Sequence, residues 1–246
     1  MPKNPRSRPE IAVAPGQDPL PLAVDDDKAG PSKQVAASES PQGTVFAMPA
    51  QLPTLRPVQS SVKRLFDIGF SATCLVVGAP FLASLALAVR LDSPGPALYR
   101  QVRVGRFGKP FHILKFRSMY TDAEAAGPRW ARSQDTRVTK VGGFLRRTSL
   151  DELPQIWNVL VGDMSLIGPR PERPVFVSRF RQNINDYDLR HCVRPGLSGW
   201  AQVNGLRGNV SIEERTVYDV HYVQKFSLVL DAACFFRTFS VLLKGD

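Results

Sequence analysis

The longest apolar run in the chain extends from Phe66 to Val89 and carries a single charged residue, Asp67. Lys63 and Arg64 precede the run, and Arg90 follows it. A straight helix over this run would measure ~36 Å at a rise of ~1.5 Å per residue, enough to cross a hydrocarbon core of ~30 Å. The pattern therefore predicts a helix that enters a membrane. A buried helix of a soluble protein is less favoured, because the run is long and almost uncharged.

Pro80 lies in the middle of this run, two residues after Gly78. Proline removes a backbone hydrogen bond and bends a helix. Two alternatives follow: a bent helix that spans the bilayer, or a helix–break–helix hairpin that enters one leaflet and returns. Basic residues on both flanks give no preferred orientation. We favour the re-entrant hairpin, because a spanning helix would place a neutral N-terminal segment without an export signal on the far side of the membrane.

The rest of the chain alternates short elements. Residues 97–105 and 109–119 are expected to form two strands joined by a glycine-containing turn, and residues 199–203 a further short strand. We expect helices from Ser149 onward, over 211–225, where apolar residues recur at helical spacing, and over 227–246. In the last helix Ser227, Asp231 and Thr238 form a narrow polar stripe, typical of a helix that lies in a membrane interface or packs deeply. The predicted fold class is α+β, mostly helical, with a small β-hairpin.

Charge and composition divide the chain into segments. Residues 1–60 hold 11 of the 21 prolines and equal numbers of acidic and basic residues, so the net charge of +10 falls on residues 61–246. A proline-rich segment without a sustained apolar period is expected to be a disordered tail. We therefore predict a tail over 1–60, a membrane hairpin over 61–93 and a catalytic domain over 94–246. A basic domain expects anionic partners.

The segment SLDELPQ, residues 149–155, places two carboxylates side by side. Ser149 followed by Glu152 matches a capping box, with Asp151 in the first turn of a helix, so a purely structural role is one interpretation. The alternative is catalytic. Arg146 and a helix N-terminus would together form an anion site, and would keep Asp151 ionised, as a nucleophile that accepts a phosphoryl group requires.

Four other basic residues lie in segments suited to phosphate binding, and they are Lys115, Arg117, Arg170 and Arg194. Arg170 stands between two prolines on a stiff loop, and glycines follow Arg194 closely. Taken singly, each has a plain alternative as a surface charge or part of a connecting loop. Their occurrence together, after a predicted membrane segment, indicates a site for a phosphorylated substrate.

Several motifs now identify a family. KRLFDI, LDSPGPALYRQ, ILKFRSM, LRRTSLDELPQ, GDMSLIGPRPE and RPGLSGWAQVNGLRG together resemble the bacterial sugar transferases, the small polyprenol-phosphate phosphoglycosyl transferases that begin exopolysaccharide and O-antigen units. The resemblance covers about residues 62–246. It implies a monotopic enzyme with a re-entrant hairpin, on the cytosolic face of the bacterial inner membrane. It also implies a Mg²⁺ requirement and an Asp-Glu catalytic pair.

The resemblance implies a role for each candidate residue. Asp151 would attack the β-phosphate of a UDP-sugar, release UMP and hold the sugar-1-phosphate until undecaprenyl phosphate takes it. Glu152 would bind Mg²⁺ together with Asp151, or act as a base, and Arg146 matches the family's phosphate-binding arginine. The residues that would bind the nucleotide or lipid phosphate are Lys115, Arg117, Arg170 and Arg194. The segment GWAQVNGLRG favours UDP-glucose as donor.

One departure from the family pattern concerns the hairpin break. Many members have Ser-Pro there, whereas this chain has Ala79-Pro80, and Ser84 is the nearest hydroxyl that could compensate. The main alternative function is a non-catalytic scaffold of the inner membrane. Nucleic-acid binding is disfavoured, because no RNP-like or helix-turn-helix pattern accompanies the basic charge. The sequence does not decide between a monomer and a homodimer.

Overall fold

A computed structural model describes residues 57–125, 135–208 and 210–244, with the side chains of 242–244 left out. The predicted tail over 1–60 therefore lies almost wholly outside the described residues. Contacts divide the chain into units over 1–45 and 46–246, and every element below belongs to the second.

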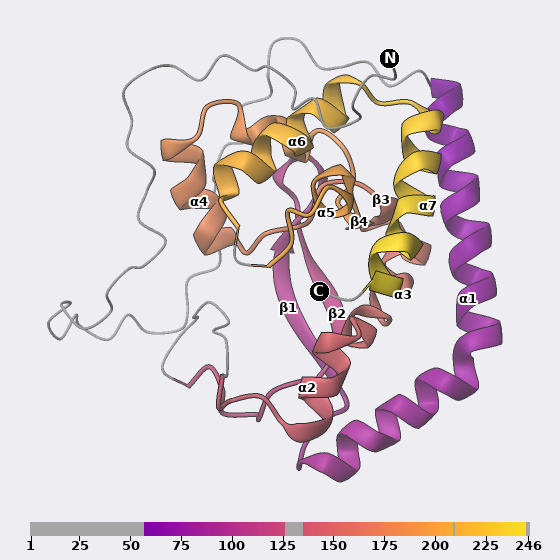
Figure 1. The fold of residues 1–246 in the computed structure, drawn as a ribbon, viewed down its shortest axis with the longest axis vertical. Helices are drawn as coiled ribbons and strands as arrows, with labels where there is room; N and C mark the ends of the chain where they lie inside the picture. Colours follow the sequence, from indigo (N-terminus) through magenta and orange to yellow (C-terminus); the bar gives the residue numbers. More distant parts are fainter. Residues whose placement is uncertain (1–56, 126–134, 209, 245–246) are drawn as a thin grey trace, which may run out of the picture. The chain divides into compact units, whose positions relative to one another are not determined.

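Helix α1, Pro57–Asp92, contains the whole apolar run and has Pro80 in its interior. It begins four residues before the predicted hairpin, with proline in the first turn, where the missing N–H costs nothing. Figure 1 shows α1 as one helix with a marked bend, its two arms running in different directions. α1 is long and apolar enough to cross a membrane by length and composition, and only 6 % of its most apolar stretch is buried. A bent apolar helix is thus confirmed, and the re-entrant path stays a prediction.

Ser84 does not compensate for the missing serine at the break. Its hydroxyl donates to the carbonyl oxygen of Phe81 at 2.7 Å. The carbonyl left without its helical partner by Pro80 is that of residue 76, four positions earlier. The bend is therefore produced without help from a hydroxyl at Ser84.

The predicted β-hairpin is confirmed. Strand β1, Leu98–Val104, pairs antiparallel with β2, Pro110–Phe116. The turn η2, Arg106–Gly108, contains two positive φ angles, at Phe107 and Gly108. Alternate residues of β2 face inward, which places Phe111 and Ile113 in the main core.

Two helices and a short turn surround the Asp-Glu pair. Helix α2 is Lys140–Arg147, the 3₁₀ turn η3 is Leu150–Glu152, and α3 is Gln155–Val161. The structure does not bear out the capping-box interpretation of Ser149. Ser149 has φ 56°, in the left-handed region, and its side chain caps nothing, because a capping side chain reaches the helix from an extended backbone. The chain instead reverses direction at Ser149.

A second, parallel pair of strands lies near this turn. Strand β3, Ser165–Ile167, pairs with β4, Gly196–Ser198. The strand predicted over 199–203 is wrong: those residues form α5, Trp200–Val203, and the strand ends just before them. The glycines around β4 allow two backbone segments to lie in direct contact. A Cβ at Gly196 would lie 2.1 Å from the nitrogen of Gly168, and one at Gly199 would lie 2.2 Å from its oxygen.

The remaining elements cover this core. They are α4, Pro174–Asn183, the turn η4, Tyr187–His191, α6, Ile212–Gln224, and α7, Leu228–Lys244. The pattern predicted α6 and α7 but not α4. The polar stripe of α7 faces inward: Asp231 bonds Lys63 and Tyr222, and Thr238 bonds Ser198. The polar stripe thus packs against the protein, and contact of α7 with a membrane interface stays a prediction.

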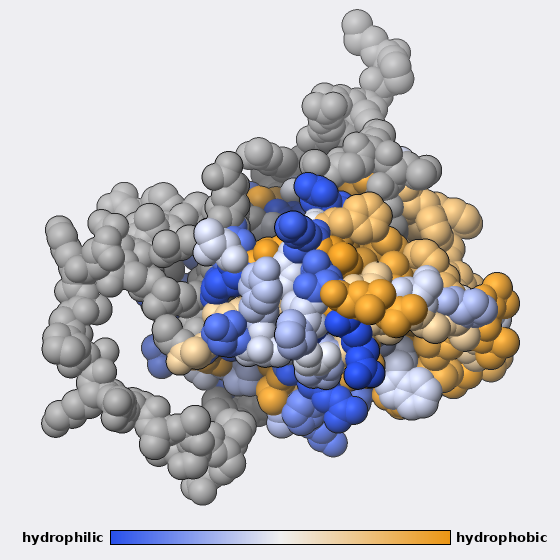
Figure 2. Space-filling model, turned by 90° about the horizontal axis from the view of Figure 1, so that it is seen from below, coloured by the Kyte–Doolittle hydropathy of each residue, from blue (hydrophilic) through white to orange (hydrophobic). Residues whose placement is uncertain are grey.

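Buried apolar side chains form a main core between β2, α3, β3, α6 and α7. Its fully enclosed members include Val159, Met164 and Val223. A smaller cluster, Val89, Phe116 and Leu145, joins the C-terminal arm of α1 to β2 and α2. Figure 2 shows apolar residues gathered on the side where α1 lies, next to a strongly polar surface. An exposed apolar surface of this kind is typical of a membrane or protein interface.

Candidate active site

Asp151 lies on the turn η3, between α2 and α3. Its exposed fraction is 9 %, and within the described ranges its carboxylate accepts no hydrogen bond. Burial raises the pKa of Asp151, while Lys115, Arg170 and Arg146 work in the opposite direction. A buried carboxylate without a partner costs stability, so its presence indicates a role other than holding the fold together.

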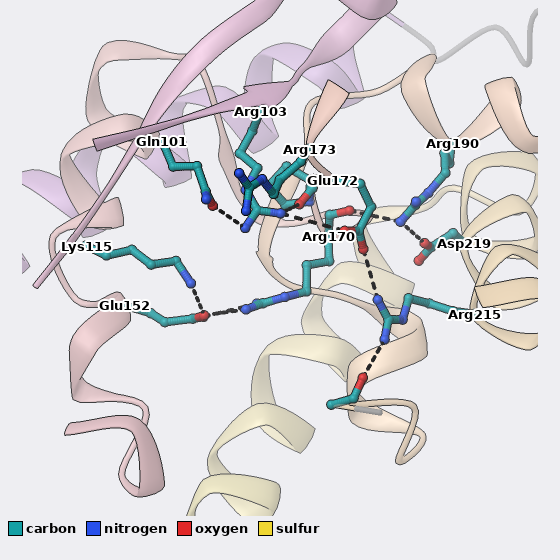
Figure 3. A network of polar contacts seen from close by, with 12 residues as sticks. Gln101, Arg103, Lys115, Glu152, Arg170, Glu172, Arg173, Arg190, Arg215 and Asp219 are labelled. Carbon is teal, nitrogen blue, oxygen red and sulfur yellow. Dashed lines mark hydrogen bonds and ion pairs between the residues drawn. The ribbon is translucent and has the colours of Figure 1, made fainter. Parts of the chain in front are cut away.

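Glu152, the next residue, has a different environment. Its Oε1 lies 2.8 Å from Lys115 Nζ, and its Oε2 lies 3.1 Å from Arg170 Nη1. Arg170 Nη2 also donates to Oε1, so the arginine forms a bidentate pair with the two carboxylate oxygens. Burial would raise the pKa of Glu152, but Arg170 and Lys115 together hold it well below its usual range. Figure 3 shows Lys115 reaching this carboxylate from above and Arg170 reaching it from the right.

The loop that carries Arg170 is fixed through its backbone. Arg190 Nη2 donates to the carbonyl of Arg170 at 2.9 Å, and Arg103 Nη1 donates to that of Pro171 at 3.1 Å. The nitrogen of Val104 donates to the carbonyl of Glu172 at 2.9 Å. Because three consecutive carbonyls of the loop each accept a hydrogen bond, the backbone of Arg170 is held in place while its side chain bonds Glu152.

A buried charge network lies behind this loop (Figure 3). Glu172 bonds Arg215 at 2.9 Å, and Arg190 bonds Asp219 at 2.7 Å. All four side chains are at least 94 % buried in this arrangement. The sequence prediction missed them, although Arg215 and Asp219 stand one helical turn apart on α6, next to inward-facing residues. Charges at such positions are retained only when they are paired.

The structure brings together Asp151, Glu152, Lys115 and Arg170, and places Arg146 near them. Arg146 lies in the last turn of α2, and its charge lowers the pKa of Asp151. Among the described residues its guanidinium has no hydrogen-bond partner, so it is free to meet an anion.

Two of the predicted phosphate-binding residues are used elsewhere. Arg117 is 5 % exposed and donates to the carbonyls of Ser93 and Pro94, each at 2.6 Å. Arg194 donates through Nε to the carbonyl of Gly162 at 2.9 Å, at the end of α3. Neither residue contacts the Asp-Glu pair in the described structure. Pro80 lies in the interior of α1 and not in the candidate site.

Comparison with known proteins gives the family. A model of the bacterial sugar transferase family matches residues 58–245. The chain belongs to the bacterial sugar transferase family. The match includes α1 and every segment that contributes to the site.

Curated relatives of this bacterial sugar transferase have related names. A UDP-glucose:undecaprenyl-phosphate glucose-1-phosphate transferase of Escherichia coli (strain K12) is 46 % identical over 188 residues, covering 75 % of this chain and 40 % of the relative. A protein of the same name from Caulobacter vibrioides is 43 % identical over 207 residues, covering 80 % of this chain and 78 % of the relative.

A third relative, from Aeromonas hydrophila, is named UDP-N-acetylgalactosamine-undecaprenyl-phosphate N-acetylgalactosaminephosphotransferase. It is 42 % identical over 191 residues, covering 77 % of this chain and 45 % of the relative. This sugar transferase chain thus spans less than half the length of the Escherichia and Aeromonas proteins.

The residues present fit a magnesium site only in part. No group of three or more His, Cys, Asp or Glu side chains capable of holding a metal occurs within the described part of the chain. Glu152 is already bonded to two cations, which leaves Asp151 as the available carboxylate. Mg²⁺ is commonly bound by one or two carboxylates together with substrate phosphates. Asp151 fits that arrangement if a diphosphate supplies the other oxygens.

The chemistry of this sugar transferase site follows from the contrast between the two carboxylates. Asp151 has no hydrogen-bond partner among the described residues, and the basic side chains around it oppose the rise in its pKa that burial causes. An ionised carboxylate in that position suits a group that reacts with a phosphorus atom. Glu152 is neutralised and held in place, which suits a group that positions Lys115 and Arg170. Environments that push two pKa values apart commonly mark different roles.

Proposed function

We propose that this protein transfers a sugar-1-phosphate from a UDP-sugar to undecaprenyl phosphate. The observation that carries the proposal is Asp151: a carboxylate that is 9 % exposed, has no hydrogen-bond partner among the described residues and is surrounded by basic side chains. Family membership and the names of the relatives give the class of reaction. A non-catalytic scaffold of the inner membrane would have no use for such a carboxylate.

In the first step, a carboxylate oxygen of Asp151 attacks the β-phosphorus of the donor. The bond between that phosphorus and the oxygen bridging to the α-phosphate breaks, and UMP leaves with the bridging oxygen. Sugar-1-phosphate remains on Asp151 as a mixed anhydride. In the second step, a phosphate oxygen of undecaprenyl phosphate attacks the same phosphorus, giving the sugar diphospholipid and restoring Asp151.

The basic side chains stabilise charge during these steps. Arg146, which has no bond of its own among the described residues, is placed to hold a phosphate of the donor. Lys115 and Arg170 keep a positive potential beside Asp151 while their own positions are fixed by Glu152. Mg²⁺, when bound with the diphosphate, would offset negative charge on the phosphate oxygens.

We propose UDP-glucose as the donor. The Escherichia and Caulobacter relatives are named for glucose, and the segment over residues 199–208 resembles the glucose-type members. The Aeromonas relative, named for N-acetylgalactosamine, has a comparable identity, so UDP-N-acetylgalactosamine is the competitor that a donor panel must include.

We further propose that α1 is re-entrant, with the catalytic part on the cytosolic face of the inner membrane. The bend around Pro80 and the exposure of the apolar side chains of α1 support this arrangement. Tags placed at both ends of the chain in intact cells test it. Labelling of the N-terminal tag from outside only would establish a spanning helix instead.

The deciding experiment measures UMP release by the purified full chain in detergent with Mg²⁺. A panel of UDP-sugars is tested, with and without undecaprenyl phosphate. Asp151→Asn is compared with Asp122→Asn, a matched change at an exposed carboxylate. Lipid-dependent turnover that is lost only in Asp151→Asn supports the proposal. No release with any donor, from folded protein with lipid present, would favour the scaffold alternative.

A further inference from the structure

The first turns of α1 carry charged side chains that reach into the catalytic part of the protein. Arg64 and Asp67 lie three residues apart, and so on one face of the helix. The helix that contains them is otherwise apolar from Phe66 to Val89. Charged side chains beside such a run are expected to be paired and to serve a function. Here Arg64 bonds backbone carbonyls of α3, and Asp67 bonds a backbone nitrogen of β3.

Arg64 holds the C-terminal end of α3. Its Nη1 donates to the carbonyl of Val159 at 2.6 Å, and its Nη2 donates to that of Leu160 at 2.7 Å. The last carbonyls of a helix have no partner within the helix, and a cation there interacts favourably with the helix dipole. Gly162 ends α3 with φ 100°, and a Cβ added to it would lie 3.2 Å from Arg64 Nη2. The guanidinium is therefore seated closely against this helix end.

Asp67 holds strand β3. Its exposed fraction is 2 %, and its Oδ1 accepts a hydrogen bond from the nitrogen of Leu166 at 3.1 Å. Leu166 is the central residue of β3, whose other edge pairs with β4. After β3 the chain passes directly through Gly168 and Pro169 to Arg170.

These two contacts fall on the two segments that carry the ion pair of the site. Glu152 lies three residues before the start of α3, and Arg170 lies three residues after the end of β3. We propose that Arg64 and Asp67 are positioning residues, through which the membrane helix sets the placement of Glu152 and Arg170 relative to each other. The role of that ion pair in turnover rests on the proposed function.

Helix α1 would then have a second role besides contact with lipid, which is to position residues of the site. A displacement of its N-terminal arm would move α3 and β3 through separate bonds, and would change the geometry around Asp151. A misplacement of about 1 Å at a reacting centre can lower a rate by about 10²-fold. Bilayer contact and catalytic geometry would therefore be coupled through these two side chains.

The test uses the full chain in detergent or nanodiscs and compares Arg64→Ala, Asp67→Ala and Asp67→Asn. Asn retains an oxygen that can accept from Leu166, whereas Ala does not. Thr73→Ala is the control, because the exposed Thr73 hydroxyl bonds only within α1, to Gly69 at 2.9 Å. Two quantities are measured: kcat and KM for UMP release, and hydrogen–deuterium exchange of the peptides over 150–161, 165–170 and 98–116.

We expect both Ala variants to lose about 10²-fold in kcat with little change in KM for the donor. Asp67→Asn and Thr73→Ala should stay close to wild type. Exchange should rise over 150–161 in Arg64→Ala and over 165–170 in Asp67→Ala, while 98–116, the β-hairpin, stays protected.

Three results would overturn the inference: unchanged kcat in both Ala variants, an Asp67→Asn variant as impaired as Asp67→Ala, or a rise in exchange over all three peptides. If the wild type releases no UMP, the proposed function fails. The exchange pattern still decides whether Arg64 and Asp67 hold the two segments.

Discussion

Two regions reached from strand β2 use basic side chains in different ways. Lys115, within the strand, points to Glu152 and takes part in the candidate active site. Arg117, just beyond the strand, is buried against the C-terminal end of α1, where it donates to the carbonyls of Ser93 and Pro94. The two residues are two positions apart, yet one bonds the carboxylate of the candidate site and the other bonds backbone carbonyls just after α1.

The difference shows what determines the role of a basic residue. A helix end offers carbonyls without partners, which an arginine can satisfy with several donors at once. A carboxylate whose two oxygens are already bonded to an arginine leaves room for the single ammonium of a lysine. The partners are contributed by segments distant in sequence, so the motif ILKFRSM alone does not distinguish the two roles.

The change with the largest expected effect is Asp151→Asn. It should lower the rate of UMP release by roughly 10³-fold or more, since an amide does not replace the nucleophile. It should leave the melting temperature unchanged or higher, because the buried carboxylate accepts no hydrogen bond from any residue that the structure describes. Initial rates and thermal melts of the two proteins check both expectations. A fall in Tm with retained activity would reverse the assignment.

Arg117→Ala should destabilise the contact between strand β2 and the backbone after α1. Losing hydrogen bonds from a buried guanidinium leaves the carbonyls of Ser93 and Pro94, just after α1, without this donor. We expect a loss of about 3 kcal/mol in the free energy of unfolding. The kcat per folded molecule should stay within about threefold of wild type, since Arg117 does not contact the Asp-Glu pair. Denaturant unfolding of Arg117→Ala against Arg100→Ala, an exposed control on β1, measures the difference. A selective loss of kcat would return Arg117 to the phosphate-binding group.

Lys115→Gln should shift the acid limb of the pH–rate profile. Asp151 must be ionised to attack, and its raised pKa places the limb above the usual range of an aspartate. Lys115 lowers that pKa, so its removal should move the limb to higher pH and reduce the rate on the acid side. Lys109→Gln, at an exposed position, serves as control. A limb that stays in place would mean that Lys115 does not act on Asp151.

Gly162→Ala should have the smallest effect. The φ of 100° at this position disfavours any residue with a Cβ, and we expect a loss of about 1 kcal/mol in stability. Turnover should fall only modestly, because the neighbouring Arg64 can adjust at its flexible end. Thermal melts and rates of this variant show how tightly the end of α3 must be held.

The sequence predicted the elements that depend on local pattern. The β-hairpin, α6, α7 and the apolar helix are confirmed, because alternation and helical spacing of apolar residues act over a few positions. The same reasoning was wrong for 199–203, where pairing with β3 uses the preceding residues 196–198 and leaves the next turn helical. It also failed at Ser149, where a left-handed backbone replaces the expected cap.

The site was predictable in part for the same reason. Asp151, Glu152 and Arg146 are close in sequence, and Arg170 was singled out by its prolines. The spacing of Arg215 and Asp219 on α6 is a local signal, but it does not give their partners Glu172 and Arg190. Those pairs form only when η4, the loop after β3 and α6 come together. Arg64 and Asp67 look like flanks of a membrane segment until their contacts with α3 and β3 are seen.

The three glycines at the β3–β4 junction have a consequence for variation in this protein. Gly168, Gly196 and Gly199 stand where a methyl group would overlap neighbouring backbone atoms at 2.1–2.4 Å. Backbone cannot yield as a flexible side chain can, so even alanine would force the loop of Arg170 away from its strand. In a library that covers every single substitution and is selected for folded protein, no replacement should survive at these three positions, while the exposed apolar positions of α1 accept many replacements.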